Sequence, residues 1–414
     1  MQKKNAVTSN QRMRQYALAI ALAMASAESS RAVGFLLPNQ DPEAIGRGDA
    51  FAATADNPSA IYYNPAGITQ LPGMQVSLGV YAISAYSSYT ATNGATAHTD
   101  PFPQFVPQVY ATYGLKNLPL FFGLGVYAPY GLGISWGQDP QFSSMAQKGS
   151  LTYLTANPVV AWKVNKMLSV AVGGTVNYGD ASFQNTLPTA EFPPGYYFKF
   201  SGQAFAPGYT AGILFQPLPR WSFGINYHSG TVMRFDGKVD QTFPFFPTSI
   251  YSSAKIDFPQ TIVGGISFRP TPKWNLEFDL NWTQWSKLSQ ISINPSPYES
   301  MIPGPETVTL NFKNSFIYDF GVTRQLGKGY YASVGYIYSE NSSPDGNFNP
   351  LIPDADLNLG NFGFGHKGKR IDWAVAYQFA YNGGRHVTTD SNDLADGTYK
   401  TFNNAVNASV TLKF

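Results

Sequence analysis

The final stretch of the chain, Phe402–Phe414, reads FNNAVNASVTLKF and decides the fold class. Its side chains alternate between two faces of an extended backbone. One face carries Phe402, Asn404, Val406, Ala408, Val410, Leu412 and Phe414, and the other carries Asn403, Ala405, Asn407, Ser409, Thr411 and Lys413. A period of two, with one mainly apolar and one mainly polar face, is typical of a strand in a transmembrane β-barrel. Residues 273–283 and 308–323 repeat the pattern, which therefore predicts several strands of this kind.

The composition of the 414 residues also favours a membrane barrel over a soluble protein. Charged residues make up 13% of the chain, whereas soluble domains average about 25%. Aromatic residues reach 15%, yet the mean hydropathy is only −0.17, which argues against a helical membrane protein. The net charge of +2 gives no reason to expect a nucleic-acid partner. The absence of cysteine fits an exported protein.

Short turns and long loops alternate along the chain from Met74 onward, as they do in outer-membrane barrels. The turns lie at 116–119, 165–166, 217–220, 270–273 and 326–329, and the longer loops lie near 90–104, 137–149, 184–197, 236–252, 287–305 and 342–365. This spacing predicts an all-β, antiparallel transmembrane barrel of about 14 strands over residues 74–414. Residues 117–138 lack charge and are long enough for a membrane helix, but their alternation and two prolines favour the third strand.

Residues 1–32 have the features of a cleavable secretory signal. The basic residues Lys3, Lys4, Arg12 and Arg14 precede a short apolar run that ends near Ala25. That run is too short to span a bilayer. Cleavage after Ala27 or after Ala32 fits the pattern, with Ala32 preferred, and either Met1 or Met13 is a suitable start.

Residues 33–73 precede the first strand and have neither a helical nor a strand period. The pairs Asn57-Pro58 and Asn64-Pro65 impose extended or turn backbone, because proline excludes the α region for the residue before it. The segment is rich in large apolar side chains, namely Phe35, Leu36, Leu37, Ile45, Phe51, Ile61, Tyr62, Tyr63 and Ile68. A disordered tail would leave them in water, so we expect a compact plug.

The run from Gly46-Arg47 to Asn64-Pro65-Ala66-Gly67 closely resembles the N-terminal hatch of the FadL family. These are outer-membrane channels for long-chain fatty acids and other hydrophobic compounds. The terminal Phe414 likewise resembles the signal that outer-membrane barrels present for assembly. The resemblance implies that residues 33–73 are a hatch that plugs the lumen of the barrel. It also implies a kinked third strand with a gap in the wall beside it.

The third strand carries the residues expected to form that gap. Its inward face is predicted to read Gly123, Gly125, Tyr127, Pro129, Gly131 and Gly133. Pro129 lacks an amide donor, and a proline within a strand belongs at a bulge or an edge. We therefore assign a ligand exit gap to Gly123, Gly125, Pro129 and Gly131, with Asn64, Pro65 and Ala66 of the hatch lining it by the family match. The alternative is that the glycines only make room for the hatch.

Two loops on the predicted extracellular side are unusually apolar. They contain Phe192, Tyr196, Tyr197 and Phe198 in one loop and Phe243, Phe245 and Phe246 in the other. Exposed apolar loops usually mark a binding surface, so we assign them to a capture groove for a hydrophobic ligand. Mutual packing of the loops or contact with lipid A is the alternative. In the FadL family the corresponding loops form such a groove, although this chain's Pro-rich loops are shorter.

Six charged side chains are expected to face the lumen: Glu277, Asp279, Lys313, Asp319, Arg370 and Asp372. Lys313 or Arg370 is the candidate cation for a ligand carboxylate. Because acids outnumber bases, a self-neutralising network that braces the wall and grips the hatch through Arg47 is preferred.

Catalysis is not supported by the sequence. The four histidines are His98, His228, His366 and His386, and only His228 has an adjacent serine on a predicted strand. No third group completes a hydrolase triad, and no metal-ligand spacing or cofactor motif is present.

These observations predict a monomeric outer-membrane channel for passive uptake of a hydrophobic small molecule. The resemblance implies long-chain fatty acids, or alternatively aromatic hydrocarbons or alkanes, with lateral release into the bilayer at the third strand. A water-filled porin and a lipid hydrolase are the less favoured classes. The expected partners are the ligand, outer-membrane lipid and lipopolysaccharide.

Overall fold

The computed structural model describes residues 35–100, 103–137, 140–186, 196–242, 249–295, 306–389 and 393–414. The predicted signal, residues 1–32, lies outside these ranges. Among the described residues, no helix has the length and apolarity needed to cross a membrane.

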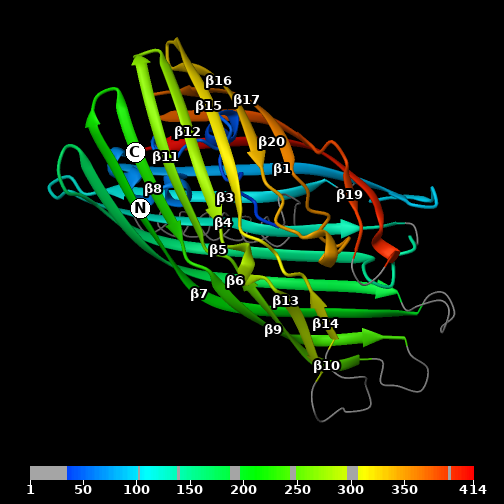
Figure 1. Ribbon diagram of the computed structural model, residues 1–414. Helices are drawn as coiled ribbons and strands as arrows, with labels where there is room; N and C mark the ends of the chain where they lie inside the picture. Colours follow the sequence, from blue (N-terminus) through cyan, green and yellow to red (C-terminus); the bar gives the residue numbers. More distant parts are fainter. Residues whose placement is uncertain are drawn as a thin grey trace, which may run out of the picture.

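The described chain is almost entirely β-sheet (Figure 1). The strands are β1 (Met74–Ala91), β2 (Thr96–His98), β3 (Gln104–Gly114), β4 (Leu120–Ser135), β5 (Lys148–Lys163), β6 (Leu168–Thr186), β7 (Tyr197–Leu218), β8 (Trp221–His228), β9 (Thr231–Gln241), β10 (Ser249–Phe258), β11 (Thr261–Thr271), β12 (Trp274–Thr283), β13 (Gln290–Pro295), β14 (Glu306–Thr309), β15 (Ser315–Gly327), β16 (Tyr330–Ser339), β17 (Leu357–Lys367), β18 (Ile371–Tyr381), β19 (Arg385–Val387) and β20 (Gly397–Lys413). Short 3-10 turns lie at η2 (Trp285–Lys287), η4 (Asp345–Asn347) and η5 (Asp393–Ala395).

The sheet closes because β1 pairs with both β3 and β20. Several consecutive strands share one position in the wall, namely β2 with β3, β8 with β9, β10 with β11, β12 with β13, β14 with β15, and β18 with β19. The described residues therefore form a closed antiparallel barrel of 14 wall strands, which confirms the predicted fold class. Residues 117–138 contribute β4 and no helix.

The alternation read from the sequence determines which face of each strand meets lipid. On β20, Phe402, Val406 and Val410 are exposed, whereas Asn403 and Asn407 are buried. Apolar side chains on the outside meet hydrocarbon, and polar ones inside find partners. The short turns all lie at one end of the barrel, and in outer-membrane barrels the short turns face the periplasm. Because the strand number is even, β1 begins and β20 ends at that same end.

Residues 35–73, here called the N-terminal segment, precede β1. They hold α2 (Pro42–Gly46), α3 (Ala60–Tyr63) and η1 (Pro65–Gln70). Asp41 caps α2 through the amide of Glu43, and Asn64 caps η1 through the amide of Ala66, with a proline following each cap. Asn64 is extended, as the proline after it requires.

The N-terminal segment lies between opposite walls of the barrel, because α2 contacts β16, β17, β18 and β20 while η1 contacts β4, β5, β6 and β7. Figure 1 shows these helices, in blue, enclosed by the strands. Nearly all of residues 35–71 are buried, including the polar ones.

Candidate functional site

The backbone of the N-terminal segment lies directly on the barrel wall, because glycines on the inward face leave room for it. A Cβ atom added to Gly363 of β17 would lie 2.7 Å from the Cα of Gly46. One on Gly224 of β8 would collide with the carbonyl of Ala52. Equivalent collisions with backbone atoms arise at Gly321 on β15 and Gly335 on β16, while a Cβ on Gly212 of β7 would meet the side chains of Asn64 and Pro65. The segment is thus held on several sides at backbone-to-backbone distance.

Acidic side chains of β12 clamp the same segment. The Asp279 carboxylate accepts hydrogen bonds from the amides of Phe51 and Ala52 at 2.8 and 2.7 Å. Glu277 accepts one from the Thr54 hydroxyl and lies 3.5 Å from the Arg47 guanidinium. Hydrogen bonds to charged groups are among the stronger ones in proteins. The predicted grip through Arg47 is therefore present.

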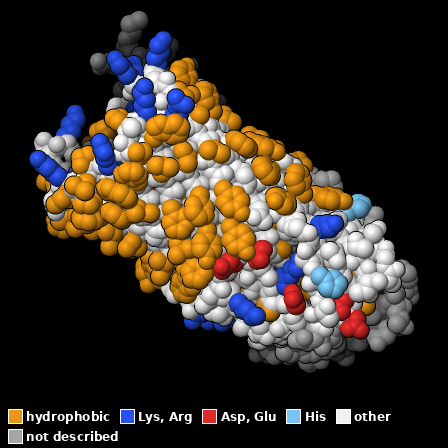
Figure 2. Space-filling view, turned by 45° about the horizontal axis from the view of Figure 1, so that its top comes forward, with side chains coloured by type: hydrophobic (Ala, Val, Ile, Leu, Met, Phe, Trp, Pro, Cys, Tyr) orange, Lys and Arg blue, Asp and Glu red, His pale blue; other side chains and the backbone are white. Residues whose placement is uncertain are grey.

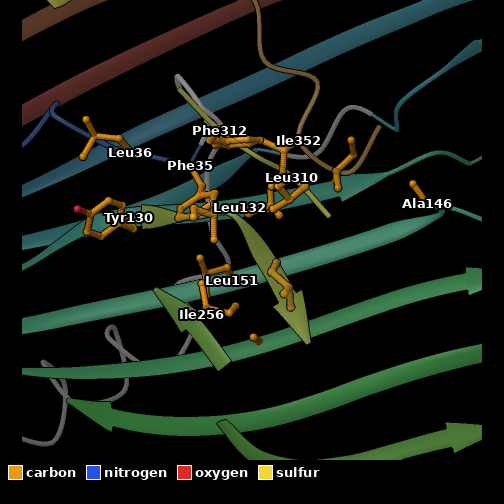
Figure 3. Close-up of a cluster of buried hydrophobic side chains, with 14 of the residues drawn as sticks. Phe35, Leu36, Tyr130, Leu132, Ala146, Leu151, Ile256, Leu310, Phe312 and Ile352 are labelled. Atoms are coloured by element: carbon orange, nitrogen blue, oxygen red, sulfur yellow. The ribbon is translucent and has the colours of Figure 1, made fainter. Parts of the chain in front are cut away.

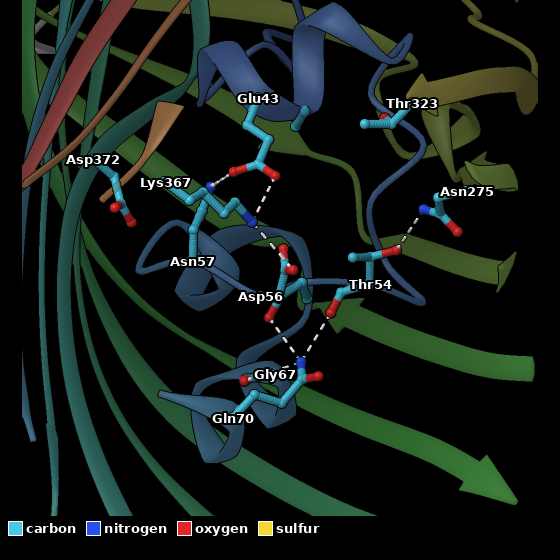
Figure 4. Close-up of polar contacts among 12 residues, drawn as sticks. Glu43, Thr54, Asp56, Asn57, Gly67, Gln70, Asn275, Thr323, Lys367 and Asp372 are labelled. Atoms are coloured by element: carbon cyan, nitrogen blue, oxygen red, sulfur yellow. Dashed lines mark hydrogen bonds and ion pairs between the residues drawn. The ribbon is translucent and has the colours of Figure 1, made fainter. Parts of the chain in front are cut away.

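Two cations of the interior are paired with acids of the N-terminal segment. Arg47 lies 2.6 Å from Glu43, and Lys367 lies 2.9 Å from Glu43 and 3.2 Å from Asp56. Figure 4 shows Lys367 between these two carboxylates. Burial raises the pKa of Asp49, in the same segment, to about 7.

The predicted set of lumen charges is partly right. Glu277, Asp279 and Asp319 are buried and face inward. Lys313 and Arg370, however, lie exposed outside the strands, so the prediction that they face the lumen is wrong. Asp372 forms an ion pair of 2.6 Å with Lys413 near the periplasmic rim. Lys367, which lies at the end of β17 next to a polar turn, was not among the predicted lumen charges.

β4, the third wall strand, bends where Pro129 was expected to bend it. Its pairing with β5 shifts register between Tyr127 and Tyr130. A one-residue shift turns the following side chains to the other face of the sheet. Leu132 and Ile134 therefore point inward, and Gly131 and Gly133 do not, which corrects the predicted inward face.

The two glycines before the bend face inward, as predicted. A Cβ on Gly123 or Gly125 would lie 2.8 Å from side-chain atoms of Ile61 in α3. These glycines make room for the N-terminal segment, which was the alternative weighed for them. They lie on the periplasmic side of the bend.

A break in the wall opens beside the bend. β3 pairs with β4 only from Val109↔Val126 to Gly114↔Phe121. Beyond Val126, β4 pairs with no residue of β3. Contact on this side resumes only near the end of β4, where the Asp100 amide donates to the Ser135 carbonyl and Thr99 bridges Trp136. We call this gap the β3–β4 break. Pro107 of β3, which was not among the predicted gap residues, lies in the part of β3 that does not pair with β4.

The N-terminal segment closes the β3–β4 break from inside. The Leu37 amide donates to the Pro129 carbonyl, and the Gly131 amide donates to the Phe35 carbonyl, both at 2.8 Å. Leu36 forms an isolated antiparallel bridge with Tyr130. Residues 35–37 thus replace the strand that β4 lacks on this side.

Asn64, Pro65 and Ala66 do not lie at the break. The Asn64 side-chain amide donates to the Ile213 carbonyl on β7, and Pro65 lies against Gly212. Ala66 follows in η1 and is fully buried. The expectation that this triplet lines the gap at the third strand therefore fails. The Asn64 side chain instead anchors the segment to β7.

A second interruption lies between β7 and β9. β7 pairs with β9 up to Gln203↔Asp236 and with β8 from Thr210↔His228. Residues 204–208 of β7 pair with neither of these strands, although they remain paired with β6. We call this feature the β7–β9 interruption. A small cavity of ≈ 40 Å³ reaches from Pro129 and Leu36 to Tyr209 and Thr231 beside it.

A cluster of packed, buried apolar side chains, here called the apolar chamber, lies on the extracellular side of the N-terminal segment. Figure 3 shows Phe35 and Leu36 together with Tyr130 and Leu132 of β4, Leu151 of β5 and Ile256 of β10. Phe35 makes edge-to-face contacts with Tyr130, Phe258 and Trp285, with ring centroids 5.0–6.0 Å apart. Such pairs stabilise a core beyond area burial alone.

An apolar pocket of ≈ 50 Å³ opens above this chamber. Phe198, one of the predicted groove residues, lines it. Most of the apolar lining was not predicted from the sequence: Met145, Phe183, Ile291, Ile293, Val308, Leu310, Leu351 and Ile352. The alternating apolar residues of 288–293 were a signal for an additional strand within a predicted loop. Tyr196 and Tyr197 are half-buried and do not line the pocket, and Phe192, Phe243, Phe245 and Phe246 lie outside the described residues.

Arg385, a cation near the apolar chamber, is also bound by other residues of the protein. Arg385 contacts Asp345 at 2.5 Å and donates to the carbonyls of Ser343 and Asp354 at 2.7 Å. Its guanidinium lies 4.9 Å from the centroid of the Phe348 ring. The stretches of sequence that separate the described ranges contain no Lys or Arg. Among the described residues that line the pocket, none is cationic.

His228 has a structural role, because it contacts the N-terminal segment. Its Nε2 lies 2.9 Å from the Tyr62 carbonyl, and the neighbouring Ser229 hydroxyl accepts a hydrogen bond from the Tyr209 amide. The ring nitrogen that a triad would use is therefore occupied by the N-terminal segment.

Comparison with known proteins identifies the family. Residues 23–413 match the family profile described as outer membrane protein transport protein (OMPP1/FadL/TodX). The chain is 23% identical over 372 residues to the 47 kDa outer membrane protein of Pasteurella multocida (strain Pm70), covering 83% of this chain and 85% of the relative. It is 21% identical over 411 residues to the long-chain fatty acid transport protein of Escherichia coli (strain K12), covering 87% and 91%.

Solved structures share the fold. A Pseudomonas aeruginosa FadL homologue superposes with a TM-score of 0.82 at 16% identity, over 92% of this chain and all of that one. The Pseudomonas putida toluene transporter TodX gives a TM-score of 0.70 at 15% identity, over 92% and 99%. The family consists of outer-membrane transport channels and not of enzymes. This chain belongs to the OMPP1/FadL/TodX family of outer-membrane transport proteins.

Proposed function

We propose that the protein carries small uncharged hydrophobic molecules from the cell surface through the apolar chamber and releases them sideways at the β3–β4 break. The N-terminal segment acts as the plug of the channel, and the barrel works as a monomer surrounded by outer-membrane lipid and lipopolysaccharide. The observation that carries the proposal is that residues 35–37, and no wall strand, complete the edge of β4 beside the chamber.

The energetics favour release into the bilayer over release into the periplasm. Returning a hydrocarbon chain to water costs about 0.8 kcal/mol per methylene, so a chain of roughly 16 carbons would pay more than about 10 kcal/mol. A path straight through the barrel would also have to displace the plug, whose backbone rests on wall glycines and on Asp279. The β3–β4 break lies on the extracellular side of most of these contacts. Moving residues 35–37 costs only the local contacts of a short segment.

The chamber favours an uncharged ligand. A buried carboxylate needs a partner, and the interior cations Arg47, Lys367 and Arg385 are already paired with acids. The aromatic lining around Phe35 suits a ring or a hydrocarbon chain. The pocket volume of ≈ 50 Å³ is smaller than the roughly 150 Å³ of an engineered cavity that binds benzene, so a ligand must displace side chains as it passes. Within the range that the resemblance implies, we therefore favour aromatic hydrocarbons and alkanes over fatty acids.

A disulfide can test the release route, because the chain has no cysteine of its own. Leu36 and Tyr130 form a non-hydrogen-bonded antiparallel pair, for which the Cα separation of about 4.5 Å lies in the range that a disulfide accepts. The double variant Leu36→Cys/Tyr130→Cys should lock residues 35–37 onto β4 when oxidised. We expect at least a tenfold slower uptake of radiolabelled toluene by cells that express only this channel.

The reduced form of the same double variant is the matched control, since it has lost the same two side chains without being locked. Uptake should recover after reduction by a membrane-permeant thiol. Equal uptake by the oxidised and the reduced protein would refute release at the β3–β4 break and leave the β7–β9 interruption as the route to test. Parallel uptake of labelled palmitate tests the ligand class, because faster uptake of palmitate than of toluene would contradict the preference for uncharged ligands.

A further inference from the structure

The short turns at the periplasmic end of the barrel are all positively charged. They lie at 115–119, 163–167, 217–220, 269–273, 324–329 and 367–370, and each contains Lys or Arg but no Asp or Glu. The exposed cations are Lys116, Lys163, Lys166, Arg220, Lys273, Arg324, Lys328, Lys369 and Arg370. We call these nine residues the basic rim. Figure 2 shows Lys and Arg side chains gathered at the end of the barrel in the upper left of that view, with no Asp or Glu beside them.

The basic rim does not follow from an overall basic composition. The whole chain has a net charge of only +2, with 27 basic and 25 acidic residues. Within the described ranges, none of the nine cations forms an ion pair with an acid, and the nearby Asp372 is taken by Lys413 at 2.6 Å. At the extracellular end, by contrast, Lys238 pairs with Asp240 at 3.1 Å and Lys255 pairs with Asp257 at 2.8 Å.

Each turn places an apolar side chain next to its cation. The exposed apolar neighbours are Leu118, Met167, Leu218, Trp274, Leu326 and Ile371, which are 38–59% exposed. Above them the wall presents the apolar band that meets lipid tails. An apolar anchor beside a cation is the arrangement of side chains at a membrane interface, where the stem lies in hydrocarbon and the charge reaches the headgroups.

We propose that the basic rim binds the anionic phosphodiester headgroups of phospholipids in the periplasmic leaflet of the outer membrane. The cations occur in all six short turns, around the circumference of the barrel, and they lie immediately beyond the apolar band. A leaflet surrounds the barrel in the same way, whereas an acidic protein docked at the mouth would need cations on one side only. Each basic side chain near an anionic surface strengthens association about fivefold, and salt screens the effect.

This inference does not depend on what the channel transports, and it can be tested with the refolded full-length protein. The rim variant Lys116→Gln/Lys166→Gln/Lys273→Gln/Lys328→Gln removes one cation from each of four turns. The matched control Lys148→Gln/Lys199→Gln/Lys287→Gln/Lys400→Gln removes four lysines that lie toward the extracellular end. A shift in gel mobility on heating shows that each variant has formed a barrel.

The measurement is the ratio of phosphatidylglycerol to phosphatidylethanolamine retained from equimolar mixed micelles, quantified by native mass spectrometry. We expect the wild type and the control to enrich phosphatidylglycerol at low salt and to lose the enrichment at 10-fold higher salt. The rim variant should retain at least fivefold less phosphatidylglycerol than the control. Equal retention by the two variants would overturn the proposal. So would a wild type that shows no preference for the anionic lipid but binds polyglutamate, because that result would assign the rim to an acidic protein partner.

Discussion

The replacement of Gly265 by alanine tests the contact between the N-terminal segment and the barrel wall by adding a single methyl group. Gly265 lies on β11, and an added Cβ would collide with Oδ1 of Asp279 and lie 3.0 Å from its Cγ and 3.1 Å from the Ala52 Cβ. The Asp279 carboxylate must move, and it holds the amides of Phe51 and Ala52. Hydrogen bonds to charged groups contribute about 1.5–3 kcal/mol each, so weakening both should cost roughly 3 kcal/mol of local stability.

A loss of roughly 3 kcal/mol corresponds to an increase of about 150-fold in the population of the open segment. Hydrogen exchange of the Phe51 and Ala52 amides should accelerate by that order, while amides of the barrel strands keep their protection. Gly264→Ala is the matched control, because a Cβ at the neighbouring Gly264 meets no atom within 4 Å. Unchanged exchange at Phe51 and Ala52 in Gly265→Ala, with a folded barrel, would refute the role of Asp279 as a clamp.

Three further predictions concern the same interior. Burial raises the pKa of Asp49 to about 7, whereas an aspartate in an unfolded chain has a pKa of about 3.9. The packed N-terminal segment therefore binds a proton more tightly than the unpacked one. Its stability should fall as the pH rises from about 4 to about 7. Residues 35–73 should therefore resist proteases better at pH 5 than at pH 8, and Asp49→Asn should reduce that difference. An unchanged difference in the variant would contradict the role assigned to Asp49. Arg47→Met leaves Glu43 and Glu277 without their guanidinium partner and should destabilise the N-terminal segment by about 3–5 kcal/mol. Proteases should then cleave the segment faster, and cleavage at the wild-type rate would contradict this prediction. Arg385→Met should loosen the loop around Phe348, seen as faster amide exchange there, and unaltered exchange would show that the ion pair with Asp345 contributes little.

The fold was predictable because its signal is local. Alternation along each strand, as at Phe402–Phe414, depends only on neighbours in sequence, and the structure has the predicted faces on β20. The proline of β4 likewise marked a bend that the structure contains. The side of the sheet on which Gly131 lies was not predictable in this way. A bulge at Ala128–Pro129 moves the residues that follow to the opposite face, and the position of the bulge depends on the pairing of β4 with β5.

The partners of the break and of the interior charges depend on contacts distant in sequence. Nothing near Phe35 indicates that it will meet β4 nearly a hundred residues later, and the Asn64-Pro65-Ala66 triplet was assigned to that place only by resemblance. Lys367 ends β17 beside a polar turn, so its sequence suggests an exposed residue, yet the structure pairs this half-buried side chain with Glu43 and Asp56. Lys313 lies near an alternating strand and reads as inward, yet it sits in an irregular stretch before β15. The capture groove and the signal peptide stay predictions.

The close seating of the plug on wall glycines has a consequence for how the molecule is assembled. Gly46 meets Gly363, and Ala52 meets Gly224, at distances that leave no clearance between the two backbones. Such tight contacts would hinder insertion of the N-terminal segment into a barrel that had already closed. We therefore expect the sheet to close between β1 and β20 around a segment that is already in place. That closure joins residues more than three hundred positions apart, and contacts of such high sequence separation form slowly.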